Sequence, residues 1–367
     1  MNCVRCNEAR ATLQVRQGPL CETCFSSYIE NKVFKHIDIL RQRLRFNRGD
    51  CKKLLVAFSG GKSSTMLLDL LAKLVQKHRE VHKTVYYEVF VAYVESGEGW
   101  DLDSLRQRYP NFTMHTVDIQ SMEILANQNT VVEHGELRVE ESNGPISTLS
   151  NFKGDNLDMC KKDILGMMQR KLLISFARSL GCIAVLYGDC MSKLAQTILS
   201  STAQGRGGSL ARELRVYQQN DLFILRPLRE VLDVEVQQYV RLNKLDTLIT
   251  DRPGKAVRST TIDELMREYL QDVHEKFPAI ASTIMSTVAK LEDPSEVYAD
   301  TCALCEAPCT DESKWLQDIT VQGLDPSPHN QTICYGCLVM ARGLKSTQFP
   351  WIGRQSTRAT LDQYIIS

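Results

Sequence analysis

LLVAFSGGKSSTMLLDLL, from Leu54 to Leu71, joins an apolar run to an amphipathic helical pattern through a Ser-Gly-Gly turn. The apolar run, Lys53 to Phe58, has the length and character of a buried strand. Glycines let a backbone approach a phosphate closely, and the N–H groups and dipole of a first helical turn attract an anion. The stretch therefore predicts a phosphate-binding glycine turn made of Ser59, Gly60, Gly61, Lys62, Ser63 and Ser64.

Two common nucleotide loops are excluded by the same residues. The GKSS segment contains the Gly-Lys-Ser of a Walker A loop, but that motif needs a glycine five residues before Gly61, where Val56 stands. A Rossmann fingerprint is excluded because no G-x-G-x-x-G occurs. The alternative that remains without any ligand is a serine-capped helix after a glycine turn.

Residues 50–291 alternate strand-like and helix-like segments. Helical patterns at 63–78 and 164–180 separate apolar segments that we interpret as strands: Lys53–Phe58, Tyr86–Val94, Phe112–Ile119, Cys182–Gly188 and Leu222–Leu228. Such alternation predicts an α/β domain with a doubly wound parallel sheet, whose ligands bind at the carboxyl ends of the strands. The polar stretch 120–158, which includes His134, does not fit this pattern and predicts an insertion or flap.

The N-terminal segment, residues 1–49, carries two closely spaced cysteine pairs. Fourteen residues separate CVRC from CETC, a spacing typical of two knuckles that close on one tetrahedral zinc ion. The expected ligands are Cys3, Cys6, Cys21 and Cys24. The residues between the pairs can form the hairpin of a zinc ribbon, and residues 25–46 have the spacing of one amphipathic helix that follows it.

The C-terminal segment, residues 292–367, repeats this arrangement with a longer intervening loop. CALC and CYGC predict a second zinc site, with Cys302, Cys305, Cys334 and Cys337 as ligands. Cys309 and His329 lie near enough in sequence to replace one of them. We therefore expect two structural zinc ions, one at each end of the chain.

The length and composition of the chain limit the kinds of protein that it can be. A chain of 367 residues exceeds the usual size of one core, so several parts are expected. Lys plus Arg and Asp plus Glu both number 44, so any nucleic-acid contact must be local. There is no apolar stretch of about 18 residues and no signal-peptide core, which predicts a soluble intracellular protein. In that compartment the thirteen cysteines are expected to be metal ligands or thiols and not disulfides.

The SGGKSS segment resembles the Ser-Gly-Gly-x-x-Ser pyrophosphate loop of the PP-loop ATPase family. Members of that family bind ATP and release pyrophosphate while they adenylate a carbonyl or amide. They include tRNA thiolases, tRNA lysidine synthetase, GMP synthetase and asparagine synthetase. The resemblance implies the adenine nucleotide alpha hydrolase-like fold and, as a possibility, ATP with Mg²⁺ at the glycine turn.

The cysteine-rich ends narrow this resemblance to tRNA thiolases with zinc ribbons. Within them the chain is similar to the second-subunit family of the eukaryotic cytoplasmic tRNA 2-thiolation heterodimers. The similar segments span nearly the whole chain: CVRC…CETCF, LLVAFSGGKSSTMLLDLL, YGDCMSKLAQTILSSTAQGRGGSL, ILRPLREVLDVEVQQYVRLNKL and CALC…CYGC.

What this family resemblance implies is a reaction and a set of partners. The partners are a catalytic subunit, tRNA thiolation protein 1, a tRNA, and a thiocarboxylated ubiquitin-like sulfur carrier. The reaction places sulfur on C2 of the wobble uridine: the C2 oxygen attacks ATP, pyrophosphate leaves, and sulfur displaces AMP. The implied location is the cytoplasm.

The chain departs from the catalytic pattern of this family at two places. Catalytic thiolases of this type carry a central Cys-x-x-Cys and a third cysteine that hold an iron–sulfur cluster or pass on a persulfide. Here Cys160 is followed three residues later by Asp163, and no cysteine occurs between Met191 and Thr301. No iron–sulfur cluster is therefore expected in this chain.

The second departure is GDCMSK, Gly188 to Lys193, which stands where active relatives show Gly-His-x-x-Asp-Asp. Ser192 and Lys193 replace two acids that could assist magnesium and nucleotide. Cys190 is either a replacement nucleophile or a small residue packed behind the strand end. The catalytic residues are thus unknown, with Cys160 and Cys190 as candidates, and the hypothesis is a degenerate subunit that completes an active dimer.

RNA contact is expected from a glycine-rich basic loop and a lysine pair. QGRGGSLAREL presents Arg206 and Arg212, and Lys161 and Lys162 follow Cys160 into a helix. A solvated charged face is an equal reading of the two lysines.

Two other functions remain open on the sequence. One is a self-sufficient thiolase that uses Cys160 and Cys190 as a sulfur relay. The other is a zinc-stapled scaffold that binds RNA or protein without nucleotide. An amidotransferase of the GMP synthetase kind is disfavoured because no glutaminase domain is visible.

Overall fold

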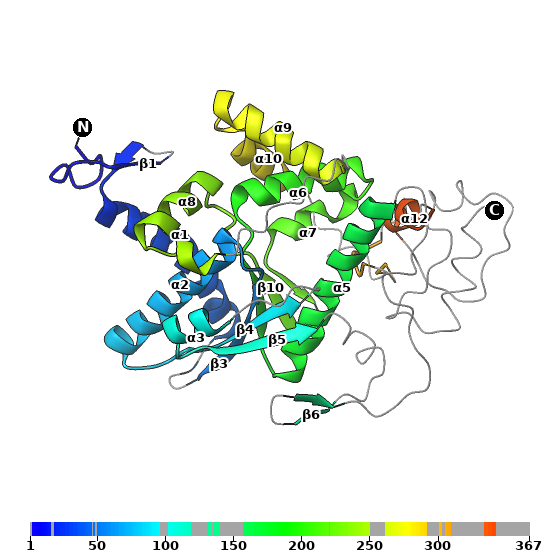
Figure 1. Ribbon diagram of the computed structural model, residues 1–367, viewed down its shortest axis with the longest axis horizontal. Coiled ribbons are helices and arrows are strands. Elements are labelled where there is room, and N and C mark those ends of the chain that lie inside the picture. The colour runs from blue at the N-terminus through cyan, green and yellow to red at the C-terminus, as the bar shows by residue number, and fades with distance from the viewer. Residues whose placement is uncertain are drawn as a thin grey trace, which may run out of the picture. The chain divides into compact units, whose positions relative to one another are not determined.

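The structure is a computed structural model (Figure 1), and its chain divides into two compact units. The first comprises residues 1–117, 180–195 and 216–256, and the second comprises residues 118–179, 196–215 and 257–367. The residues that the structure describes are 2–15, 18–45, 47, 50–95, 102–118, 131–133, 136–138, 157–219, 221–249, 261–291, 301–302, 305–309 and 334–342. Within these ranges no helix combines the length and apolar character needed to cross a membrane.

A six-stranded sheet forms the centre of the first unit. Across the sheet the strands are β5 (Thr113–Asp118), β4 (Tyr87–Glu95), β3 (Lys52–Phe58), β8 (Ala184–Tyr187), β10 (Leu222–Leu225) and β9 (Tyr217–Gln219). β3 is parallel to both β4 and β8, β10 is parallel to β8, and β9 is antiparallel to β10. All five predicted strands are present, and β9 is an edge strand that the sequence analysis did not include.

The chain order reverses between β3 and β8, and this reversal locates the expected ligand site. From β3 the chain continues outward to β4 and β5 on one side, then returns to β8 and β10 on the other. A doubly wound sheet binds its ligands beyond the carboxyl ends of the strands at such a switch point. The prediction of an α/β sheet of this class is confirmed.

The middle of β3 is buried on both faces. Leu54, Leu55 and Val56 are each fully buried. Three consecutive buried residues are typical of a central parallel strand, because helices cover both faces of such a sheet. This is why LLVAF is a continuous apolar run and does not alternate.

Helices of the first unit pack beside this strand. Helix α2 (Lys62–Lys77) contacts β3, α8 (Asp233–Leu242) and α1 (Glu22–Leu44). The predictions of helices at 25–46 and 63–78 are thus confirmed to within three residues at each end. The remaining helical elements of this unit are α3 (Asp103–Arg108), a π-helical turn (His78–His82) and a 3₁₀ turn (Asp246–Leu248).

The buried carboxylate of Asp69 joins α2 to α8 and to the end of α3. The hydroxyl of Tyr239 donates a hydrogen bond to Asp69 Oδ2 at 2.7 Å, and the hydroxyl of Tyr109 donates one to Asp69 Oδ1 at 3.2 Å. Lys73 lies 3.0 Å from Asp69 Oδ2 and completes the charge pair. A buried carboxylate is tolerated because each of its oxygens is hydrogen-bonded.

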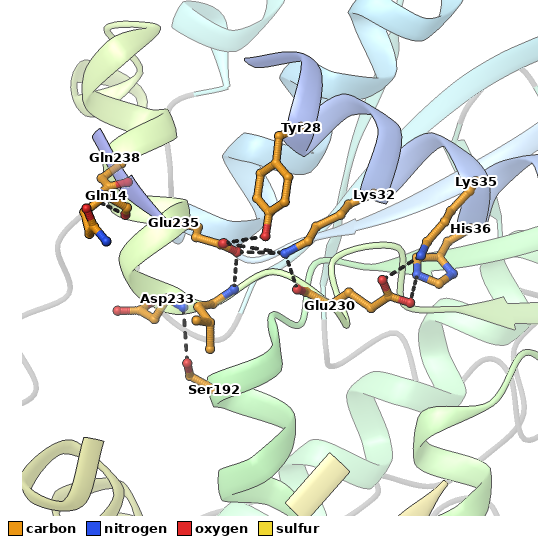
Figure 2. A network of polar contacts seen from close by, with 11 residues as sticks. Gln14, Tyr28, Lys32, Lys35, His36, Ser192, Glu230, Asp233, Glu235 and Gln238 are labelled. Carbon is orange, nitrogen blue, oxygen red and sulfur yellow. Dashed lines mark hydrogen bonds and ion pairs between the residues drawn. The ribbon is translucent and has the colours of Figure 1, made fainter. Parts of the chain in front are cut away.

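A second network of polar contacts joins α1 to α8 and to the loop before it (Figure 2). The carboxylate of Glu235, on α8, is almost fully buried. It accepts a hydrogen bond from the Tyr28 hydroxyl at 3.0 Å and lies 3.3 Å from the Lys32 ammonium, both on α1. The same carboxylate accepts the Leu232 N–H at 3.0 Å, so it also holds the first turn of α8.

Glu230, in the loop before α8, makes the other half of this network. Its two carboxylate oxygens lie 3.0 Å from His36 Nε2 and 2.7 Å from Lys35 Nζ. The His36 contact lowers the pKa of Glu230 to about 2, burial opposes this shift, and the Lys35 contact adds to it. Figure 2 shows both α1 side chains pointing at the same carboxylate.

Among its described residues, the second unit is mainly helical. It contains the following elements: a β6 (Val131–Glu133) and β7 (Glu136–Arg138) hairpin, α5 (Leu157–Ser179), a 3₁₀ turn (Gly207–Ser209), α7 (Leu210–Leu214), α9 (Ile262–Lys276), α10 (Ile280–Val288) and α12 (Tyr335–Arg342). Helix α6 (Met191–Ala203) follows β8 in the chain. Thr261 caps α9 by accepting the Glu264 N–H at 3.3 Å. The hairpin lies within the predicted insertion 120–158, most of which, with His134, falls outside the described residues.

The Asp69→Ala substitution should lower the free energy of unfolding by about 3 kcal/mol, because it leaves two tyrosine hydroxyls and an ammonium group without their shared partner. Urea unfolding measures this loss. Asp103→Ala is the matched control, because the ion pair of Asp103 with Arg106 is exposed and its loss should change the free energy of unfolding little. Equal stability of the two variants would contradict the role assigned to Asp69.

Stability should also depend on pH through Glu230. Its folded pKa lies below the ordinary value of 4.5, so its contacts stabilise the fold above about pH 4.5 and are lost as the pH falls through about 2. Because the carboxylate is more than a third exposed, we discount the effect to about 1 kcal/mol. Between about pH 5.5 and about pH 3, the free energy of unfolding should fall less in Glu230→Gln than in the native chain. Parallel losses would contradict this.

Candidate functional site

The glycine turn between β3 and α2 has a backbone that requires glycine. Gly60 has a φ of 76°, in the left-handed region that other residues rarely adopt. Gly61 is extended and caps α2, which begins at Lys62. The hydroxyl of Ser64 donates to the Gly61 carbonyl at 2.9 Å and accepts the Ser59 N–H at 3.4 Å. The sequence thus folds here into a tight turn that leads into a helix N-terminus.

Gly188 lies against the first turn of α2. A Cβ at Gly188 would come within 2.8 Å of the Cα of Ser64 and 3.0 Å of its nitrogen. Real side chains do not approach backbone so closely, so only glycine fits. Because Gly188 follows β8 and the glycine turn follows β3, the two loops meet at the switch point of the sheet.

The residues after Gly188 are engaged by other parts of the first unit. The Cys190 thiol is 3% exposed, and burial raises its pKa. Ser192 Oγ accepts the Asp233 N–H at 3.2 Å, at the start of α8. Asp189 Oδ2 lies 3.4 Å from Nε of Arg226, which follows β10 and is itself buried. A buried protonated thiol is a weak nucleophile.

The N-terminal cluster consists of Cys3, Cys6, Cys21 and Cys24. Their four sulfur atoms lie within 4.8 Å of one another. The predicted hairpin between the pairs is present as antiparallel strands β1 (Leu13–Val15) and β2 (Gly18–Leu20). Cys21 caps α1, so the second cysteine pair stands at a helix N-terminus.

The C-terminal cluster, Cys302, Cys305, Cys334 and Cys337, repeats the local geometry of the N-terminal one. Its four sulfur atoms also lie within 4.8 Å of one another. In each cluster the fourth residue after the first cysteine, Asn7 or Glu306, has a φ of 59° and donates its N–H to that cysteine's carbonyl. Cys334 precedes α12 as Cys21 precedes α1.

In the described part of the C-terminal segment, the four knuckle cysteines are the group that could hold a metal ion. Cys309 is buried nearby, with its sulfur 3.9 Å from the Ala307 carbonyl, and it is not among the four that converge. His329 lies outside the described residues. The structure therefore supports the two knuckles as one site that can hold a metal ion.

The sulfur spacings suit one metal ion per cluster. The Cys6 and Cys21 sulfurs are 3.9 Å apart, and those of Cys305 and Cys334 are 3.7 Å apart. Four thiolates placed tetrahedrally at about 2.3 Å from one ion are about 3.8 Å from one another. Hydrogen bonds from the backbone, that of Cys6 first, lower the pKa of Cys3 to about 6, which favours a thiolate ligand.

The arginines predicted to contact RNA are held by protein groups in the second unit. Arg206 Nη2 lies 2.8 Å from Asp163 Oδ2, and Arg212 Nη1 donates to the Glu306 carbonyl at 2.8 Å. Cys160, Lys161 and Lys162 lie in α5, and the structure describes only their backbone.

The sequence did not predict several contacts around the glycine turn and around Arg206. The role of Arg226 could not be predicted because it stands at the end of an apolar run. The pairing of Arg206 with Asp163 could not be predicted because 43 residues separate them in sequence. The contact of Gly188 with α2 could have been suspected, since a glycine that ends a strand often marks a close backbone approach.

The strand order and the glycine turn at its switch point define a doubly wound α/β fold of the PP-loop ATPase type, and a four-cysteine cluster lies toward each end of the chain. Among solved structures, the U34-tRNA thiolase NcsA from Methanococcus maripaludis, with its 4Fe–4S cluster, is similar in fold. The TM-score is 0.54 at 16% sequence identity, over 82% of this chain and 92% of that one. At this identity the similarity shows the fold alone.

Within this class the chain resembles one family. Residues 261–339 match the family model of cytoplasmic tRNA 2-thiolation protein 2. The proteins of that name from Schizosaccharomyces pombe and Phaeosphaeria nodorum are 27% and 29% identical to this chain. The matches cover 94% and 91% of this chain, respectively, and 93% of each relative. The predicted resemblance to the cytoplasmic tRNA 2-thiolation protein 2 family is thus confirmed along most of the chain.

Gly188→Ala should displace the first turn of α2 and destabilise the chain by about 2 kcal/mol, because the new methyl group meets backbone that cannot swing away. Thermal unfolding measures the loss. The matched control is Gly166→Ala in α5, where no atom lies within 4 Å of the added Cβ and helix propensity should make alanine neutral or stabilising. A Gly188→Ala chain as stable as the native one would contradict the contact.

Proposed function

We propose that this chain is the non-catalytic subunit of a cytoplasmic tRNA 2-thiolation enzyme and that it acts as a heterodimer with the catalytic tRNA thiolation protein 1. Relatives that align with more than nine-tenths of the chain carry the name cytoplasmic tRNA 2-thiolation protein 2. A protein of similar fold is a U34-tRNA thiolase. The dimer would take sulfur from a thiocarboxylated ubiquitin-like carrier and place it on C2 of the wobble uridine.

The non-catalytic role is supported mainly by the burial and contacts of the residues that follow Gly188. Cys190 is buried with a raised pKa, so it lacks the exposed thiolate that sulfur transfer needs. Ser192 holds the N-terminus of α8 by accepting the Asp233 N–H. Asp189 pairs with Arg226. These residues support the fold, and a self-sufficient thiolase built on Cys160 and Cys190 is disfavoured.

The glycine turn is the part of this subunit that would bind an anion. Ser59 and Lys62 are exposed, and the N–H groups of the first turn of α2 point out of the helix N-terminus. These residues would hold a phosphate, either of ATP with Mg²⁺ or of the tRNA backbone. An ATP bound at this turn would be held by its phosphates, and adenylation of the uridine oxygen would be the reaction of the catalytic partner.

Zinc is the metal we propose for both clusters. Four cysteine ligands at tetrahedral spacing are typical of structural zinc, and the sulfurs of a cubane iron–sulfur cluster lie farther apart than those observed. We accordingly assign residues 1–49 and 292–367 as zinc-stapled segments on either side of a PP-loop segment, residues 50–291.

Contact with tRNA is proposed for Lys161 and Lys162, near the start of α5. Two adjacent cations suit a phosphate backbone and carry no sequence preference. Arg206 and Arg212 were expected to share this role, but both are engaged by protein groups of the second unit. Their contribution to RNA binding is therefore proposed as secondary.

The purified chain, without its catalytic partner, should release no pyrophosphate from ATP in the presence of tRNA. A mixture with the catalytic partner should release pyrophosphate and form 2-thiouridine. Cys190→Ser in this chain should leave both rates unchanged, because the thiol is buried and takes no part. Release by this chain alone, or loss of turnover in Cys190→Ser, would overturn the proposal. With Gly60→Asp in this chain, a raised KM for tRNA assigns the turn to tRNA, and a raised KM for ATP assigns it to the nucleotide.

The isolated chain should contain two equivalents of zinc, one per cluster. Cys21→Ser and Cys334→Ser should each remove one equivalent and lower the melting temperature, because metal binding contributes directly to folding. Metal analysis of the purified variants tests this. Iron and sulfide in place of zinc, or an unchanged content in either variant, would contradict the assignment.

A further inference from the structure

The loop after α6 is fitted against the second knuckle of the C-terminal cluster. Gly205 has a φ of 75°, and a Cβ there would come within 2.6 Å of the Tyr335 ring. A Cβ at Gly336 would overlap Cγ of Arg206 and come within 3.1 Å of its Nε. Both glycines are therefore needed for close packing between Gly205–Arg206 and the residues between Cys334 and Cys337.

The Arg206 side chain is four-fifths buried beside this knuckle. Its Nη2 pairs with Asp163 at 2.8 Å, and its Nη1 donates to Gln204 Oε1 at 3.0 Å. Among the described residues its buried Nε–H has no hydrogen-bond partner. An unsatisfied buried donor costs about 1–3 kcal/mol, so an acceptor is expected on the side that faces the knuckle.

The cysteines of the C-terminal cluster lie within electrostatic reach of Arg206. Arg206 packs on Gly336, the residue before Cys337, so its guanidinium lies next to this cluster. A divalent ion with four thiolates carries a net charge of about −2, and thiolates accept hydrogen bonds. A buried dianionic group is stabilised by a nearby cation that can donate N–H groups.

The other knuckle is held by a similar cation. Arg212 Nη1 donates to the carbonyl of Glu306, the residue after Cys305. The Glu306 side chain pairs in turn with Lys171 on α5 at 2.6 Å. One arginine from the Gln204–Arg212 segment thus contacts each half of the cluster.

We infer that Arg206 is the outer-shell cation of the C-terminal metal site: its guanidinium, oriented by Asp163, donates N–H groups toward the metal-bound thiolates and secures the Cys334–Cys337 knuckle. Arg206 is therefore a positioning residue for the metal. The inference holds whether or not the chain takes part in tRNA thiolation.

The test measures zinc retention in the full-length, zinc-loaded chain. A chromogenic chelator follows zinc release, and mass spectrometry of alkylated peptides reports which cysteines lose protection. Arg206→Met keeps an unbranched stem against Gly336 but removes the charge and the N–H donors. Arg170→Met is the matched control, since Arg170 pairs with Glu213 in the same unit at 3.0 Å.

In Arg206→Met the affinity of the C-terminal cluster for zinc should fall about 10- to 100-fold, as is typical for loss of an outer-shell partner. The N-terminal cluster should keep its zinc and serves as an internal control. Arg170→Met should behave as the native chain. C-terminal cysteines that remain as protected in Arg206→Met as in the native chain would overturn the inference.

A general folding defect is distinguished by the buried thiols of the first unit. Unfolding of Arg206→Met would expose Cys182 and Cys190 to alkylation along with the clusters. In that case Arg206→Lys decides, because lysine keeps the charge but lacks the planar fork and should still lose zinc faster than the native chain. Native zinc retention in a folded Arg206→Lys chain would overturn the inference.

Discussion

The contact between the backbone of Gly188 and the backbone of Ser64 is the constraint on which the carboxyl edge of the sheet depends. It brings the loop after β8 against the first turn of α2 with no side chain between them. The switch point of the sheet fixes where a ligand would bind, and this contact fixes how the two loops that border that place are spaced. Asp189 follows directly and Ser192 comes three residues later, and both contact other elements of the first unit.

Helix α8 connects the other parts of the first unit to this edge. Glu235 and Tyr239 lie four residues apart on α8 and therefore on one side of the helix. Glu235 reaches α1 through Tyr28 and Lys32, and Tyr239 reaches α2 through Asp69. The helix that follows the N-terminal cysteine cluster is thus joined to the helix that begins at the glycine turn by buried, fully paired carboxylates.

Much of this arrangement was predictable from local patterns. Strand β3, the turn and α2 follow from one apolar run, two glycines and a helical period, and the cysteine clusters follow from spacing alone. The three-residue edge strand β9 was missed because it is too short to show a period. The engagement of Arg206 was also missed, because its partners Asp163 and Gly336 lie 43 residues before and 130 residues after it in sequence, where spacing gives no guide. Glycines around an arginine suggested an open loop, yet here they make room for side chains packed against it.

The two cysteine clusters close rings of chain, and these rings differ in length. In the N-terminal cluster the ring contains a hairpin whose register pairs Leu13 with Leu20, so an added residue would shift every pair. In the C-terminal cluster 28 residues lie between Cys305 and Cys334, against 14 between Cys6 and Cys21, and doubling the length of a ring costs only about 0.6 kcal/mol in closure entropy. The greater length of the C-terminal ring therefore adds little to the cost of bringing its four cysteines together.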